Sequence, residues 1–160
     1  MSKTYRVAFA GAGGIVQAAH IPNFQSLSNV ETVALADVNE ARAKSVAAEK
    51  KIKSAYTDFN TMLEKEQPDI VVIASPNVFH KPMAMAALDA GAHVLCEKPL
   101  ALTYADSVEL FEKAASKKRV LTVGTHYRFT DPMQLCKAHV DGNFFGYIYA
   151  ARTTYCRRSG

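Results

Sequence analysis

A short glycine-rich segment, Gly11–Gly14 (GAGG), lies between the first apolar run of the chain and a segment of helical character. Glycine-rich pieces alone are weak evidence, but one at a strand–turn–helix junction strongly constrains the fold. There Gly11 allows a tight turn, and Gly13, without a Cβ, lets the backbone approach a pyrophosphate. The N–H groups at the helix start, including those of Gly14 and Ile15, then hold the phosphates. The segment therefore predicts a dinucleotide-binding turn.

One position of this pattern is unusual. The third small residue falls on Val16, where glycine or alanine is typical. We expect Val16 to hold the helix slightly farther from the sheet, with Gly14 loosening the turn in compensation. The alternative interpretation is a glycine turn that binds nothing.

Strand-like runs alternate with helical segments over about 125 residues. The predicted strands are Thr4–Ala10, Glu31–Asp37, Ile70–Ala74, His93–Cys96 and Val120–Val123. The predicted helices are Gly13–Phe24, Asn39–Lys51, Asp58–Glu66, Phe79–Ala90 and Thr103–Lys118. Asn39, Asp58 and Thr103 are candidate N-caps, and Pro22 indicates an early end or a kink in the first helix. Alternation of this kind predicts βαβ units with right-handed crossovers, and so an α/β fold with a doubly wound parallel sheet (a Rossmann fold).

The end of the chain follows a different pattern. Asp131–Val140 predicts a helix, whereas Gly146–Arg158 is rich in Tyr and Thr, which favours a strand. We predict two domains: a dinucleotide-binding domain over residues 1–125, and the beginning of a truncated α+β domain over residues 126–160. A terminal strand with unpaired backbone groups favours strand pairing, so we expect a homo-oligomer.

An acidic residue, Asp37, ends the second predicted strand, 21 residues beyond Val16. At about this spacing a carboxylate accepts hydrogen bonds from the adenosine ribose hydroxyls. A carboxylate also repels a 2′-phosphate, so the sequence favours NAD over NADP. The alternative is an aspartate that caps the next helix, although Asn39 already offers that cap.

Polar residues also follow the strand Ile70–Ala74. Ligands of open α/β sheets bind beyond the carboxyl ends of the strands, so Ser75 and Asn77 are candidates for lining the cofactor. His80 follows at the start of the next helix. A turn that merely ends the strand explains Ser75 equally well, and a structural histidine at a helix end explains His80.

Charge and cysteine content exclude several classes of function. The formal charge is +4, but the basic clusters at residues 50–53 and 117–119 are interpreted as solvated helix ends, and no nucleic-acid-binding motif accompanies them. No stretch approaches ~18 uncharged apolar residues, so we expect no membrane span. The start shows no signal-peptide pattern. The three cysteines lack metal-ligand spacing, so we expect no metal site and reduced thiols in a cytoplasmic protein.

The motif Glu97-Lys98-Pro99 directly follows the strand His93–Cys96. With it, the sequence resembles the Gfo/Idh/MocA oxidoreductases, the family of glucose–fructose oxidoreductase and inositol dehydrogenase. The other matching pieces are GAGGIVQAAHIP (Gly11–Pro22), Asp37, Ser75-Pro76-Asn77 with His80, AGAHVLCEKPLALT (Ala90–Thr103) and VGTHYRF (Val123–Phe129). They cover essentially the whole chain in order, and Glu-Lys-Pro is the most specific of them.

The resemblance implies roles for residues at the carboxyl ends of the strands. Glu97 is implied to contact the nicotinamide ribose, and Lys98 to lie beside the nicotinamide and contact the substrate hydroxyl. Arg42 is implied to lie against the adenine. His126 and Arg128 are implied to approach the nicotinamide.

The role implied for Lys98 also makes physical sense. Hydride transfer from an alcohol requires loss of the hydroxyl proton, and a nearby ammonium stabilises the forming alkoxide or takes part in a proton relay. The resemblance further implies a cis peptide before Pro99 that directs Lys98 into the cleft. The alternative is a surface lysine before a proline turn.

The resemblance implies an NAD-dependent dehydrogenase acting on a sugar, a cyclitol or a related polyol. Its substrate domain, with the Asp and His of proton transfer, would lie beyond residue 160, so we expect this chain to bind cofactor without turning over substrate. Two alternatives stay open: a non-catalytic relative in which nucleotide binding regulates a protein partner, and a plain NAD-binding fragment.

Overall fold

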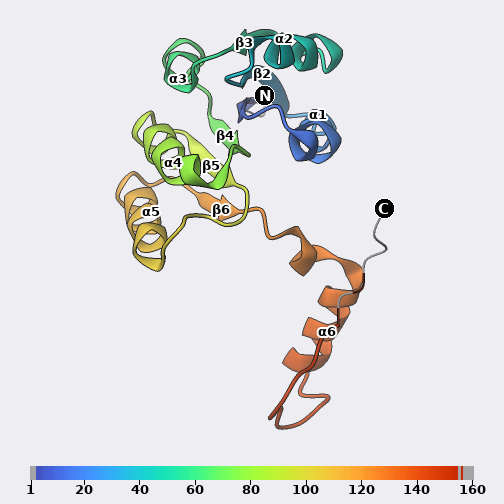
Figure 1. Cartoon of the computed structure of the whole chain (residues 1–160). Coiled ribbons are helices and arrows are strands. Elements are labelled where there is room, and N and C mark those ends of the chain that lie inside the picture. The colour runs from blue at the N-terminus through green and yellow to red at the C-terminus, as the bar shows by residue number, and fades with distance from the viewer. Residues whose placement is uncertain (1–2, 155, 157–160) are drawn as a thin grey trace. The chain divides into compact units, whose positions relative to one another are not determined.

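The computed structural model describes residues 3–154 and 156. Backbone contacts divide the chain into two units, the first ending at Gly124 and the second beginning at Thr125. The strands of the first unit are β1 (Tyr5–Ala10), β2 (Val30–Ala36), β3 (Ser54–Tyr56), β4 (Ile70–Ile73), β5 (His93–Cys96) and β6 (Leu121–Val123). They form one parallel sheet in the order β3-β2-β1-β4-β5-β6 (Figure 1). This order confirms the predicted doubly wound Rossmann fold.

Helices cover both faces of the sheet. They are η1 (a π-helix, Val16–His20), α1 (Ile21–Gln25), α2 (Glu40–Glu49), α3 (Phe59–Glu66), η2 (a 3₁₀ turn, Asn77–Phe79), α4 (His80–Asp89) and α5 (Tyr104–Ser116). The three predicted N-caps are confirmed: the side chains of Asn39, Asp58 and Thr103 each accept a hydrogen bond from a backbone N–H of the first helical turn. Such caps satisfy N–H groups that a helix leaves without an internal partner.

Strand β1 lies inside the sheet, and its position explains why its sequence does not alternate in polarity. Ala8 and Ala10 belong to the core that α3, α4 and α5 cover, whereas Val7 and Phe9 belong to the core beneath η1, α1 and α2. All four side chains are fully buried. A strand covered on both faces needs apolar residues at successive positions, and this is the pattern that the sequence shows.

The first helix is continuous but not regular. The predicted disturbance near Pro22 takes the form of the π-helix η1, in which the Ile21 N–H donates to the Val16 carbonyl oxygen. Pro22 has no N–H to donate to the preceding turn, and it lies at the first positions of α1, directly after the π-turn. The Val16 side chain, at the unusual third position of the glycine pattern, is fully buried in the core with Phe9.

The buried cysteine and the two exposed cysteines should differ in reactivity. Burial, with a smaller contribution from the neighbouring Glu97 carboxylate, raises the pKa of Cys96 to about 12. Cys136 and Cys156 are exposed and free. We expect the native chain at pH 8 to react with a thiol reagent at two cysteines only, and at three after unfolding, as counted by mass spectrometry. Fast labelling of Cys96 in the native state would contradict this arrangement.

The second unit contains a 3₁₀ turn, η3 (His126–Phe129), and helix α6 (Asp131–Asp141), which confirms the helix predicted there. The predicted strand Gly146–Arg158 is wrong in its described part, because residues 146–154 form no strand. An extended segment needs a partner strand for its backbone hydrogen bonds, and the described part of this unit offers none. Residues 155 and 157–160 of that prediction lie outside the described residues.

Candidate functional site

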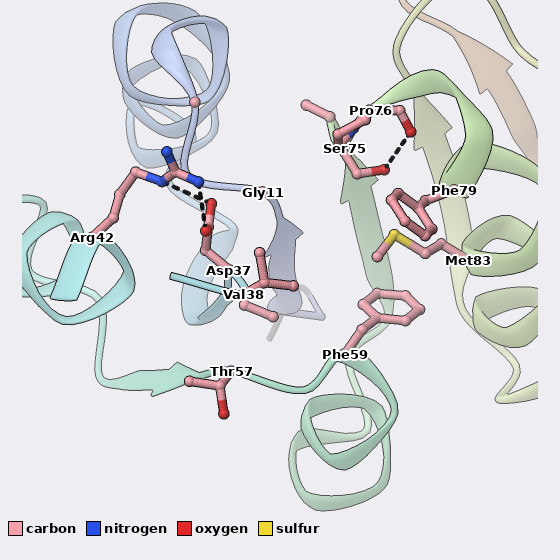
Figure 2. Close-up of a pocket in the computed structure, with 13 residues that line it drawn as sticks. Gly11, Asp37, Val38, Arg42, Thr57, Phe59, Ser75, Pro76, Phe79 and Met83 are labelled. Atoms are coloured by element: carbon pink, nitrogen blue, oxygen red, sulfur yellow. Dashed lines mark hydrogen bonds and ion pairs between the residues drawn. The ribbon is translucent and has the colours of Figure 1, made fainter. Parts of the chain in front are cut away.

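A cavity of about 380 Å³ opens at the carboxyl edge of the sheet, where β1, β2, β3 and β4 end (Figure 2). It is lined by Gly11, Gly13, Ala36, Asp37, Val38, Arg42, Thr57, Phe59, Ala74, Ser75, Pro76, Phe79 and Met83. Five of the predicted cofactor-binding residues thus lie around one cavity. It borders β1 and β4, where the strand order of the sheet reverses, which is where open α/β sheets bind ligands.

Glycine occupies two positions of the turn, 11 and 13, for different physical reasons. Gly11 has a φ of +103°, and a Cβ there would lie 2.6 Å from the carbonyl oxygen of Ala74. Folding itself therefore requires glycine at this position. A Cβ at Gly13 would meet no heavy atom within 4 Å, although Gly13 lines the cavity. Gly13 therefore leaves open space at the helix start, as close approach of a pyrophosphate requires.

Asp37 ties the glycine turn to the end of β2. Its buried carboxylate accepts the N–H of Ala12 at 2.8 Å and that of Asn39 at 2.9 Å. The guanidinium of Arg42 donates to both carboxylate oxygens, from Nη2 at 2.7 Å and from Nε at 3.1 Å (Figure 2). Burial acts to raise the pKa of Asp37, but these hydrogen bonds, above all those from Arg42, outweigh it and leave the pKa below its usual value. The carboxylate is therefore ionised at neutral pH.

The contacts at the start of α2 show that Asp37 is not its N-cap. The N-cap of α2 is Asn39, whose side chain accepts the Arg42 N–H at 3.0 Å. Asp37 instead lines the cavity opposite apolar side chains, among them Phe59 and Met83, which Figure 2 shows on the far wall. A charged group and a flat apolar wall suit the ribose and the base of a nucleotide, respectively.

The residues that follow β4 divide into two groups. Ser75 lines the cavity, whereas Asn77 is exposed outside the lining. His80 is buried, and its ring nitrogens contact the carbonyl oxygens of Pro99 (Nδ1, 2.7 Å) and Ser75 (Nε2, 2.9 Å). Both partners are main-chain carbonyl oxygens, one in the segment after β4 and the other in the segment after β5. His80 thus joins the segments that follow β4 and β5.

Glu97 and Lys98 lie at the end of β5, outside the cavity lining. The Glu97 carboxylate lies 2.9 Å from Nε2 of His20 and accepts the Lys98 N–H at 3.2 Å. The Lys98–Pro99 peptide is cis, as the resemblance implied. Lys98 is exposed, and none of the ion pairs among the described residues involves its ammonium. That leaves it available to an incoming ligand.

Four further predicted residues lie at the helix start or in the second unit. Gly14 and Ile15 are exposed at the helix start. His126 and Arg128 belong to the second unit, so their approach to the nicotinamide stays a prediction. Sequence analysis did not single out His20, although it lies in the GAGGIVQAAHIP segment. Only the fold shows that it meets Glu97, 77 residues away.

Other kinds of site would need metal ligands or a membrane-spanning helix among the described residues. No three or more His, Cys, Asp and Glu side chains gather there as they would around a metal ion. No helix among the same residues is both long and apolar enough to cross a membrane.

A glycine turn with open space at a helix start, an ionised carboxylate one strand away and an apolar wall opposite that carboxylate define a dinucleotide-binding Rossmann domain. Residues 5–125 match the family described as "Oxidoreductase family, NAD-binding Rossmann fold" (Gfo/Idh/MocA). The chain belongs to this family.

Named relatives agree with this assignment. The D-glucoside 3-dehydrogenase of Escherichia coli is 33% identical over 159 residues, which are 99% of this chain and 45% of that protein. The solved WlbA dehydrogenase of Bordetella pertussis, in complex with NADH and UDP-GlcNAcA, is 26% identical with a TM-score of 0.86, over 92% of this chain and 45% of its own. The scyllo-inositol dehydrogenase of Lactobacillus casei, with bound NAD(H) and scyllo-inositol, is 26% identical with a TM-score of 0.81, over 90% and 43%. The chain thus spans less than half the length of these relatives.

Proposed function

We propose that this chain is the cofactor-binding part of an NAD-dependent dehydrogenase that acts on a CH–OH group of a sugar, a cyclitol or a related polyol. The observation that carries the proposal is the open space at Gly13 beside the ionised Asp37 carboxylate. The names of the relatives, a glucoside dehydrogenase and an inositol dehydrogenase among them, support the substrate class.

The residues around the cavity suit the parts of the cofactor. The N–H groups of Gly13, Gly14 and Ile15 would hold the pyrophosphate. Asp37 would accept hydrogen bonds from the adenosine ribose, and Ser75 and Asn77 would lie along the cofactor with His80 behind them. When bound, NAD supplies the carbon that accepts the hydride.

Arg42 has a specific part in this proposal. Four donors already fill the acceptor positions of the Asp37 carboxylate, so a ribose hydroxyl has to replace one of them. Two are main-chain N–H groups fixed by the fold. The Arg42 side chain is 49% exposed and is the replaceable donor. We propose that ribose binding moves its guanidinium onto the adenine.

Lys98 and Glu97 would serve the nicotinamide side of the site. Lys98, exposed and without a described ion pair, would stabilise the alkoxide that forms as the substrate hydroxyl loses its proton. Glu97 would contact the nicotinamide ribose, and His126 and Arg128 would approach the nicotinamide from the second unit. We further propose that residues 1–125 form the cofactor domain and that residues from 126 onward begin the substrate domain.

The protein is also proposed to be a cytoplasmic homo-oligomer. Free Cys96, Cys136 and Cys156 support a reducing compartment. Exposed aromatic side chains of the second unit, such as Phe144 and Tyr149, support association with further protein surface.

Titration of NADH fluorescence with this chain tests cofactor binding. We expect saturable binding in the micromolar to low millimolar range, because most of the cofactor contacts lie within the chain. No change up to millimolar NADH would contradict the proposal. A steady-state assay of the full-length protein with NAD and a panel of sugars and cyclitols tests the chemistry. NADH binding without turnover of any of them would favour the non-catalytic alternative.

A further inference from the structure

A histidine near the glycine turn is paired with the glutamate at the far side of the site. Nε2 of His20 lies 2.9 Å from Oε1 of Glu97, and the two side chains are only 15% and 12% exposed. A carboxylate oxygen is an acceptor, so Nε2 carries the proton in this contact. A mostly buried pair of this kind is screened less by solvent and salt than a surface ion pair.

The position of His20 depends on the π-helix. His20 is the last residue of η1, directly before α1, which contains Pro22. A π-turn takes one more residue than an α-turn, and so it changes the direction of the side chains that follow it; such turns are frequent at functional sites. The irregular turn thus belongs to the element that starts at the glycine turn and ends at the Glu97 contact.

Gly124, directly after β6, lies close against the same carboxylate. A Cβ at Gly124 would lie 2.9 Å from Oε1 and 3.1 Å from Cδ of Glu97. The Lys98 N–H donates to Oε2 at 3.2 Å. Segments that follow β1, β5 and β6 therefore fix one carboxylate among them.

The topology places this carboxylate at the second nucleotide of the cofactor. In a doubly wound sheet β1 to β3 and β4 to β6 form two mononucleotide-binding halves, and the dinucleotide lies across both. Asp37 follows β2 in the first half, and Glu97 follows β5 in the second. A group that fixes Glu97 therefore acts on the second half alone.

We propose that His20 is a positioning residue that holds Glu97, and with it the Lys98 segment, for the nicotinamide nucleotide. The inference rests on the proposed function, because it assumes that the crevice takes NAD. His20 belongs to the helix that would bind the pyrophosphate, so the pair links the phosphate site to the nicotinamide site. Loss of the pair weakens binding of the nicotinamide half and spares the adenosine half.

Binding of two nucleotides to this chain tests the proposal. ADP probes the adenosine half, and NADH probes both halves; calorimetry gives the two dissociation constants. NADH binds more tightly than ADP by the contribution of its nicotinamide half, and in His20→Ala we expect this gain in affinity to fall about tenfold. That is the effect of losing one hydrogen bond to a charged group. We expect ADP binding to be unchanged. His20→Gln keeps a side-chain N–H donor at similar reach and should restore most of that gain.

His93→Ala is the matched control. This histidine, at the start of β5, accepts the Val120 N–H at 2.9 Å at the opposite edge of the sheet. We expect it to leave the ratio of the two dissociation constants unchanged. Gly124→Ala places a Cβ against the same carboxylate and should lower the gain in affinity from ADP to NADH even where His20→Ala does not fold.

Three results would overturn the inference: an unchanged ratio in His20→Ala and in Gly124→Ala, equal weakening of ADP and NADH, or failure of His20→Gln to restore the gain. They differ from failure of the proposed function, in which the unaltered chain binds neither nucleotide.

Discussion

We expect Gly11→Ala to lower the free energy of unfolding by about 3–4 kcal/mol, one of the largest effects of any single substitution in this chain. Two costs add here. An alanine at a φ of +103° is strained, and its Cβ would overlap the carbonyl oxygen of Ala74 at 2.6 Å. That oxygen belongs to the backbone, so no flexible side chain yields to relieve the contact. Urea denaturation followed by circular dichroism measures the loss.

Gly13→Ala is the matched control, because we expect it to affect NADH binding and not stability. Its Cβ meets no heavy atom within 4 Å, so we expect stability to change by less than about 1 kcal/mol. NADH binding should nevertheless weaken by about tenfold or more, since the methyl group occupies the space proposed for the pyrophosphate. If Gly13→Ala bound NADH as tightly as the unaltered chain, the phosphate site would lie elsewhere.

The second large effect concerns Asp37. In Asp37→Ala the N–H groups of Ala12 and Asn39 and the Arg42 guanidinium lose a buried acceptor. We expect a loss of about 2–4 kcal/mol in stability, weaker NADH binding, and a smaller preference for NADH over NADPH. Parallel titrations with both reduced cofactors measure the preference. An unchanged preference would contradict the ribose role.

Asp58→Ala controls for the loss of an aspartate at a helix start. Asp58 caps α3 and accepts the Thr61 N–H at 2.7 Å, on the exposed surface. Its loss should cost about 1 kcal/mol and leave the cofactor preference unchanged.

The effect of Asp37 on stability depends on pH in a defined direction. The pKa of Asp37 is lower in the folded state, so its contribution is fully present above the ordinary aspartate pKa of 3.8. The contribution is lost as the pH falls through the lower, folded pKa. The difference in stability between the unaltered chain and Asp37→Ala should therefore be constant near neutral pH and shrink below about pH 4.

Much of the fold followed from local patterns, and what did not has physical reasons. Apolar runs, caps and the glycine turn each depend on residues close in sequence, so they were predictable. Strand β3 (SAY) is three half-buried residues without the aliphatic side chains that marked the equally short β6 (LTV), so its sequence carries too little pattern to detect. The segment Gly146–Arg158 has strand-forming residues, but a strand also requires a partner, which composition does not report.

The candidate site, too, was predictable in some parts and not in others. Spacing after strands pointed to Gly13 and Asp37, because strand ends of a parallel sheet converge at one edge. The pairing of Arg42 with Asp37 and of His20 with Glu97 depends on side-chain direction. The second pair also depends on an irregular helical turn, which no periodicity in the sequence revealed.

The His80 ring has a consequence for the energetics of binding. One imidazole spans the carbonyl oxygens of Ser75 and Pro99, so the spacing of the two segments is set as the chain folds. A ligand that arrives later meets walls already in place and loses little affinity to immobilising them. Much of the conformational entropy of these segments is therefore lost during folding and not during binding, through a side chain that does not line the cavity.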